Sequence, residues 1–291
     1  MWKLIPSPSS LSTTLDTSTN IHRENEDASN NSSLPQQIYD SFNSLILYHF
    51  LPAGYPHTVS PTYSQFALYC FFANCAGSAA MVLSTQSLLL AVGVGSATAA
   101  PASAAFNWIM KDGIGQLGGV LFASRLGRAS GSAASNVDND PKRWRMASSL
   151  CMDASTLLEI SSPLFPGYFL PIASIANVGK NIGFLSASAS RASIHQSISC
   201  SNNLGDVTAK SGSQSIAASL VGTAIGIGLS QVVLDGTNVL DVTMGFVVLS
   251  VIHQGCTYRS LRSVELQTLN RHRLHLVLDD FVRRCSDGNH S

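Results

Sequence analysis

The sequence predicts an all-α protein, a multi-helix bundle in which two neighbouring helices form a membrane hairpin. Hydrophobic residues make up 45% of the 291 residues, and charged residues only 12%, against about 25% charged in an ordinary soluble domain. No Asp, Glu, Lys or Arg occurs in the stretch 41–110. No stretch alternates at period two with β-branched residues, so the sequence predicts no sheet.

Composition also argues against some classes of partner and ligand. Lys plus Arg and Asp plus Glu each number 17, so the net charge does not indicate a nucleic-acid partner. The dispersed cysteines and histidines lack the paired spacing of metal ligands, and we expect neither a metal nor a cofactor. The positive mean hydropathy indicates extensive burial, in protein or in lipid.

The chain divides into three predicted parts. Residues 1–33, rich in Ser, Thr and Asn, predict a disordered leader, with an organelle-targeting segment as the alternative. The helical domain is expected at 34–273 and a short tail at 274–291. The domain begins with a short apolar helix at 34–51.

Three signals place the helices that follow. The prolines of "LPAGYPHTVSPTY" forbid a long helix and predict an ordered, extended link. The apolar residues 66–90 predict a buried helix or a weak membrane span. Asp140 as N-cap and Pro141 at the first helical position predict a helix that "SSP" ends near residue 161.

The stretch "KDGIGQLGG" has the G-x-G-x-x-G spacing of a dinucleotide-binding fold through Gly113, Gly115 and Gly118. Asp138 follows at about the distance of that fold's ribose-binding acid. The fingerprint requires a preceding strand, whereas "PASAAFNWIMKD" is helix-prone. We therefore predict that these glycines and Gly119 form a face for close helix packing.

The predicted membrane hairpin covers 216–255. Its first segment, "IAASLVGTAIGIGLSQVVL", is uncharged and as a helix spans roughly 28 Å, close to the hydrocarbon core of a bilayer. The expected partner is the uncharged segment 242–255, with the outer ends on the cytosolic, stromal or matrix side. The alternative is a hairpin buried in a large soluble core. Small residues that recur every fourth position predict the helix-packing face: Ala218, Gly222, Gly226 and Ser230.

Ionisable and amide side chains in apolar surroundings are the candidates for a ligand site. Asp153 and Glu159 lie on an apolar helix, and acids at membrane depth need partners; Arg191, Lys180 and Lys210 are the available bases. These residues predict a site for a small anionic metabolite or a proton relay, or else simple pairing among themselves. The stretch "NNLGDVTAKSGSQS" forms one wall of such a site or a capped helix start. The candidate ligand-binding residues are Asp153, Glu159, Arg191, Asn203, Asp206, Lys210 and Gln214.

No catalytic motif accompanies them: the sequence contains neither a G-x-S-x-G elbow nor HExxH. We therefore predict a non-enzymatic protein. The competing hypotheses are a membrane scaffold or carrier, an obligate partner of a related protein, and a soluble nucleotide-cofactor enzyme that uses "DGIGQLGG".

Several ordered stretches resemble the root UVB sensitive (RUS) family. The resemblance is carried by "LPAGYPHTVSPTY", "FNWIMKDGIGQLGGVLFAS", "DNDPKRWRMASSL", "LEISSPLFP", "SRASIHQ", "NNLGDVTAKSGSQS" and "HQGCTYRSLRSVELQTLNRHR". The matched motif residues are Gly113, Trp144, Arg145, Asp153, Glu159, Arg191, Asn203, Asp206, Lys210 and Gln214. The chain departs from the family pattern at Ser148-Ser149, near Ser197 and at Ser215.

The resemblance implies a multi-pass, membrane-associated helical protein without enzymatic activity. It further implies a role in the UV-B response, early development and vitamin B6 homeostasis. The partners it implies are a RUS paralogue or a second copy of the chain and a B6 vitamer as small anionic metabolite. A plastid is one compartment that the family occupies.

Overall fold

The computed structural model describes residues 44, 48–93, 101–128, 137, 140–232, 238–266 and 271–288. In these residues the regular structure is helical, which confirms the all-α prediction, and extended backbone pairs only in an isolated bridge between Val59 and Ser199. Contacts divide the chain into two compact units at Leu51 and Pro52. The helices described below belong to the second unit. The predicted leader and most of the predicted helix at 34–51 lie outside the described residues.

Helix α3 (Tyr63–Val92) is the long apolar helix expected at 66–90. Gly93 ends it in the left-handed conformation, with φ of 82°, and its N–H caps the last carbonyl groups of the helix, a common helix ending. The link before α3 is ordered, as predicted, because its backbone pairs with the chain after residue 197. Ser60 N–H donates to the Ile198 carbonyl at 2.9 Å, and Cys200 N–H donates to the Thr58 carbonyl at 3.2 Å.

Helix α4 (Pro101–Arg128) contains the glycine motif in its interior. A Cβ at Gly115 would overlap the side chain of Asn177, and one at Gly118 would overlap Val178. Both neighbours lie on α7 (Phe169–Ile198), which packs along α4. The glycines therefore allow close helix packing, as predicted, although Gly113 faces open space.

Helix α6 (Pro141–Ile160) begins and ends where the sequence predicts. The Asp140 side chain accepts from the backbone N–H of Arg143, and Pro141 is the first helical residue. Two short 3₁₀ turns, η1 (Ser162–Leu164) and η2 (Pro166–Tyr168), then lead into α7. Sequence reasoning did not predict α7, whose small residues and serines give only a weak helical pattern.

The small-residue face predicted on α8 (Leu204–Val232) exists, but its expected partner was wrong. A Cβ at Gly222 would overlap the backbone of Cys75, and one at Gly226 would overlap the backbone of Ala79. Both belong to α3, so α8 packs closely on α3 instead of on its sequence neighbour α9 (Val239–Ser263). Ala218 is fully buried. This approach is possible because α3 also has small residues at the contact, Cys75 and Ala79.

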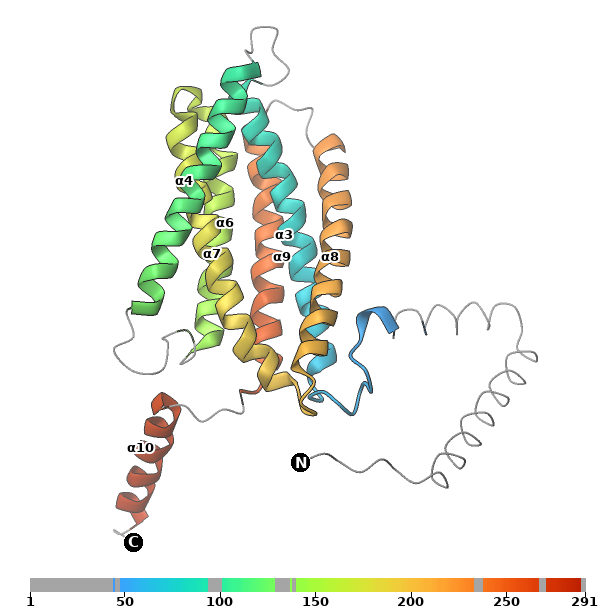
Figure 1. The fold of residues 1–291 in the computed structure, drawn as a ribbon, viewed down its shortest axis with the longest axis vertical. Helices are drawn as coiled ribbons and strands as arrows, with labels where there is room; N and C mark the ends of the chain where they lie inside the picture. Colours follow the sequence, from blue (N-terminus) through green and yellow to red (C-terminus); the bar gives the residue numbers. More distant parts are fainter. Residues whose placement is uncertain are drawn as a thin grey trace, which may run out of the picture. The chain divides into compact units, whose positions relative to one another are not determined.

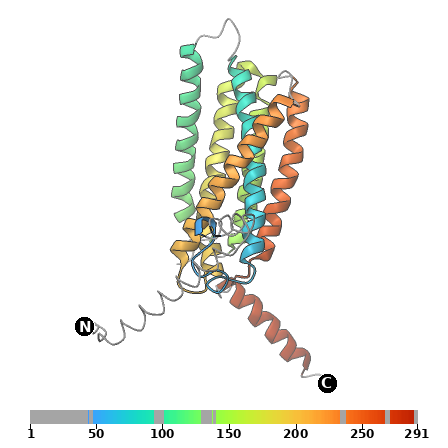
Figure 2. The same ribbon diagram turned by 90° about the vertical axis from the view of Figure 1, so that its right-hand side faces the viewer.

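Helix α3 is the common partner of the bundle and packs against α8, α9 and α6; α6 and α4 pack in turn against α7. Figures 1 and 2 show these long helices running side by side, with α4 beside α7 and α8 beside α3. One core cluster joins α3, α6 and α9 through Ala79, Ala80, Leu83, Ile160, Val242, Phe246 and Leu249.

In the part of the chain that the structure describes, three helices are long and apolar enough to cross a membrane: α3, α9, and α8 over Leu204–Gln231. Much of the apolar surface of α8 and α9 faces outward, including Leu220, which is 69% exposed, and Val251, which is 68% exposed. The sequence predicted the two spans of the hairpin and left residues 66–90 as a buried helix or a weak span; α3 has the length and composition of a span. The predicted tail overlaps α10 (Arg271–Gly288), an amphipathic helix.

Candidate functional site

The carboxylate of Glu159 is held inside the bundle by two other helices. Lys180 on α7 forms an ion pair with Glu159 Oε2, and the Ser84 hydroxyl on α3 donates to the same atom. Glu159 is only 2% exposed, and a buried carboxylate requires such partners. The structure therefore brings two residues of the predicted acid–base cluster, Glu159 and Lys180, together in a structural ion pair between α6 and α7. Ser84 adds a contact from α3.

Asp153 lies on the same helix but faces α9. Its Oδ2 accepts from the Ser250 hydroxyl at 2.6 Å and from the Gln254 amide at 2.7 Å. Its Oδ1 lies 2.8 Å from His253 Nδ1. Burial alone would raise the pKa of Asp153, but the contacts with His253, Ser250 and Gln254 outweigh it and lower the pKa, so the carboxylate is ionised at neutral pH. The base expected beside Asp153 was Arg191, Lys180 or Lys210; the structure places His253 there.

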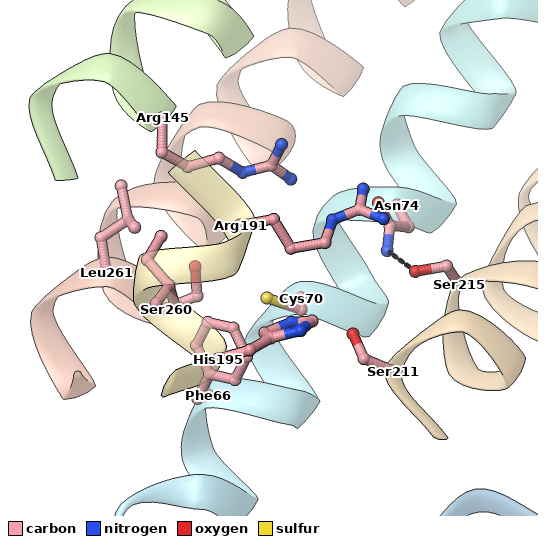
Figure 3. A pocket seen from close by; sticks show the side chains of 11 residues that line it. Phe66, Cys70, Asn74, Arg145, Arg191, His195, Ser211, Ser215, Ser260 and Leu261 are labelled. Atoms are coloured by element: carbon pink, nitrogen blue, oxygen red, sulfur yellow. Dashed lines mark hydrogen bonds between the residues drawn. The ribbon is translucent and has the colours of Figure 1, made fainter. Parts of the chain in front are cut away.

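Arg145 on α6 and Arg191 on α7 line one small cavity together with residues of α3 and α8 (Figure 3). Both line a small cavity of about 40 Å³, together with Asn74 and Ser215. Both also line a neighbouring cavity of about 220 Å³, which Asp153 and His253 line as well. The two cavities therefore share Asn74 and the two arginines.

Neither arginine forms an ion pair with any residue that the structure describes. The ion pairs there join Asp112, Asp140, Glu159, Asp153 and Asp280 to other bases. Arg145 is half-buried and Arg191 is exposed; two neighbouring positive charges repel each other, and an anion bound between them would reduce that repulsion. The arrangement is therefore suited to bind an anion, because paired guanidinium groups present several donors to its oxygens.

His195 is a buried histidine that lines the smaller cavity beside the two arginines. The imidazole is 2% exposed, packs edge-on against Phe66 with ring centroids 6.4 Å apart, and places Nδ1 3.1 Å from the Thr208 hydroxyl. Burial, and then the charges of Arg191 and Arg145, lower the pKa of His195 to about 4. The imidazole is therefore neutral at pH 7.

The remaining predicted residues lie just before α8 or in its first half, and their contacts join separate segments of the chain. Asp206 Oδ2 accepts from the backbone N–H of Ala53 at 2.7 Å. Gln214 donates to the Tyr63 hydroxyl at 3.1 Å, and Ser199 donates to Asn203 at 2.7 Å. Lys210 is half-buried on α8. None of these residues lines either arginine cavity, so the ordered helix start describes them better than a ligand wall.

Sequence reasoning missed Arg145 and His253 as site residues. Arg145, Ser149 and Asp153 follow one another at four-residue intervals and line the larger cavity together. That helical spacing was a usable signal. His253 gave none, because its partner Asp153 is 100 positions away in the chain. In the described residues, no group of three or more His, Cys, Asp or Glu lies where a metal ion could be held.

Fold and site together define a class: an all-helical bundle with membrane-length helices and a positively charged internal cavity. Residues 36–285 match the family model "Vitamin B6 photo-protection and homoeostasis domain". The chain belongs to the root UVB sensitive (RUS) family, as the sequence motifs indicate. The fold has no match among solved structures.

Relatives from plants and from an amoeba match most of the chain. It is 32% identical over 251 residues to protein root UVB sensitive 3 of Arabidopsis thaliana, which covers 85% of this chain and 55% of the relative. It is 33% identical over 254 residues to protein root UVB sensitive 2, chloroplastic, of the same plant, covering 86% and 54%. RUS family member 1 of Dictyostelium discoideum is 31% identical over 242 residues, covering 83% and 45%. The chain thus spans about half the length of these relatives.

Proposed function

We propose that this chain is a membrane-embedded, non-enzymatic RUS protein that binds a small anionic metabolite between Arg145 and Arg191. A phosphorylated B6 vitamer is the proposed ligand, which would make the protein a scaffold or carrier in vitamin B6 homeostasis. A role in the UV-B response is part of the same proposal, because the family model and the relatives are named for UV-B sensitivity. A role in early development is proposed from the resemblance of the sequence motifs to the family.

The observation that carries the proposal is the pair of arginines without a carboxylate partner among the described residues. The larger cavity beside them, about 220 Å³, has apolar walls at Met152 and Phe184 and polar walls at Ser149 and Thr156. Small-molecule sites combine apolar walls with a few placed polar groups. A ligand that consists of a small ring and an anionic substituent matches this cavity, because the ring can contact the apolar walls while the anionic group contacts the arginines.

A binding experiment tests the proposal. We expect the purified protein in detergent to bind pyridoxine 5′-phosphate, which lacks the aldehyde that reacts with lysines, and to bind pyridoxine much more weakly. Arg145→Gln and Arg191→Gln should each weaken binding by about tenfold or more, because a charge-assisted contact is worth about 1.5–3 kcal/mol. Arg143→Gln is the matched control, since that side chain is 88% exposed on the same helix. Equal affinity in all three variants would exclude this site.

The membrane part of the proposal rests on the outward apolar faces of α8 and α9 and on the length of three helices. In lipid such faces need no polar cover, whereas in water they would form a large exposed apolar patch. We expect the tagged protein to stay in the membrane pellet after alkaline carbonate extraction. Release into the supernatant would contradict membrane insertion and leave a helical bundle whose outer faces bind protein partners.

A specific surface favours a second candidate function, pairing with a RUS paralogue. A groove of about 540 Å³ between α3 and α8 is lined by hydroxyl and apolar side chains, among them Ser78, Thr85 and Ser219. Small and hydroxyl residues let membrane helices approach closely. Ser219→Leu should reduce co-purification of a co-expressed paralogue, whereas Leu220→Ala, on the neighbouring lipid-facing position, should not.

A further inference from the structure

Resting on the proposed membrane insertion, we propose that α10 lies along the bilayer surface, with its apolar face among the lipid headgroups and the first acyl carbons. The membrane beside the end of α9 thus covers that face. Three features carry this inference: the width of the apolar face, the balance of the charges on the polar face and the short link to α9.

The apolar face of α10 is wider than the seam of a coiled coil. Its described side chains, each at least 40% exposed, are Leu274, Val277, Leu278, Phe281 and Val282. At the α-helical repeat they cover about 140° of the circumference. A coiled coil uses a narrower stripe that repeats over about three heptads or more, and α10 has only 18 residues. The face therefore fits the broad surface of a bilayer better than a second copy of the helix.

The acids and arginines of α10 balance among the side chains that the structure describes. Asp279 and Asp280 stand against Arg283 and Arg284, and all four side chains are exposed. Arg284 Nη2 also lies 2.9 Å from Asp280 Oδ2 in an ion pair. Attraction to anionic lipid is therefore weak, and burial of the apolar face must supply most of the affinity for the membrane.

The C-terminal end of α9 has the features of a membrane boundary. Tyr258 is 58% exposed there, and Arg262 lies in the last turn. Tyrosine rings and long basic side chains are typical of the level where hydrocarbon meets water. Arg259 lies over the ring of Tyr69 on α3, so a second membrane-length helix has an aromatic ring at the same level. The chain therefore leaves α9 at the bilayer surface.

The link from α9 keeps α10 close to that surface. Only residues 264–270 lie between the two helices, and a link of this length reaches at most roughly 30 Å when fully extended. Such a tether makes contact with the bilayer an intramolecular step, at an effective concentration in the millimolar range. In water, by contrast, an isolated helix as short as α10 is only marginally stable. The bilayer surface is therefore both near and favourable.

Tryptophan probes on opposite faces of α10 test the inference in the full chain, reconstituted into phosphatidylcholine vesicles. Phe281→Trp places the probe on the apolar face, and Asp279→Trp places it on the polar face. Both positions are exposed, so neither variant disturbs a core. Lipids with bromine on the upper acyl chain quench only an indole that contacts them. The native tryptophans contribute the same background to both variants.

We expect brominated lipid to quench the added emission of Phe281→Trp several-fold more than that of Asp279→Trp, because an interfacial helix buries its apolar face about 5–10 Å deep. The difference should be the same at low and at high salt, since salt does not screen apolar burial. Equal quenching of the two probes would overturn the inference. A requirement for anionic lipid or for low salt would overturn the claim that the apolar face holds the helix on the membrane.

Two further measurements identify other occupants and separate this inference from the proposed function. Protection of the Phe281→Trp probe from acrylamide without quenching by brominated lipid would overturn the inference, because a protein surface would then cover the face. Carbonate extraction of the same vesicles reports on the bundle. Equal quenching in a protein that stays in the carbonate-washed vesicles would remove the inference and leave the membrane insertion standing. Release of the wild type would overturn both.

Discussion

Nδ1 of His253 on α9 lies 2.8 Å from Oδ1 of Asp153 on α6. The two residues are 100 positions apart in the chain, and their contact joins the two helices. Ser250 and Gln254 complete the contacts of the carboxylate from the same face of α9. Because hydrogen bonds to a charged group are stronger than those between neutral groups, this cluster fixes how α9 is rotated against α6.

Removal of the carboxylate should therefore destabilise the bundle. Asp153→Ala leaves three donors without their acceptor, and we expect a loss of about 3–5 kcal/mol, the range seen when one member of a buried charged pair is removed. The midpoint of thermal unfolding in detergent measures the change. Asp241→Ala, an exposed acid in the first turn of α9, is the control and should cost less than about 1 kcal/mol. Equal losses in both variants would contradict the role of the cluster.

The Glu159–Lys180 pair should show strong coupling. Glu159→Gln or Lys180→Met alone leaves a buried charge unbalanced, with an expected cost of about 3–5 kcal/mol. The double variant should be less destabilised than the sum of the two single variants, because it leaves no unpaired charge. A double-mutant cycle on the unfolding free energy measures this coupling; additive costs would mean that the two side chains act independently.

The close approach of α8 to α3 predicts opposite effects at two glycines of one helix. Gly226→Ala places a methyl group against the backbone of Ala79, whereas Gly228 faces open space. We expect Gly226→Ala to destabilise by about 1–3 kcal/mol through overpacking. Gly228→Ala should be neutral or stabilise by up to about 1 kcal/mol, the usual gain of alanine over glycine in a helix. The midpoints of thermal unfolding of the two variants measure these changes. If Gly226→Ala stabilises the protein, close packing of α8 on α3 at this position is excluded.

His195 should make stability depend on pH. Its pKa of about 4 in the folded protein lies below the ordinary value of 6.5, so between these values the unfolded chain binds more protons. The contribution of the neutral imidazole is fully present above pH 6.5 and is lost as the pH falls toward 4, about 3 kcal/mol in all. We expect His195→Gln to flatten the curve of unfolding free energy against pH in this window. If His195→Gln keeps the wild-type slope of unfolding free energy against pH, groups other than His195 cause the pH dependence.

The sequence by itself determined the helical class, the family and several local features. Asp140 and Pro141 predicted the start of α6, the glycines of 113–119 predicted close packing, and the charge-free stretch predicted α3. These features depend on neighbours in the chain: a cap bonds to a residue three positions on, and a small-residue face follows the helical repeat. Periodicity alone is enough to identify them.

Only the tertiary structure decided which helices meet. The small-residue face of α8 was expected to pack on α9, and it packs on α3, because the repeat that creates a face does not specify which helix covers it. For the same reason, His253 was not named among the bases available to Asp153, and Arg145 was not selected as a site residue. Electrostatic partners are set by distance in space, and in a bundle of long helices residues about a hundred positions apart, such as Asp153 and His253, lie within hydrogen-bonding distance.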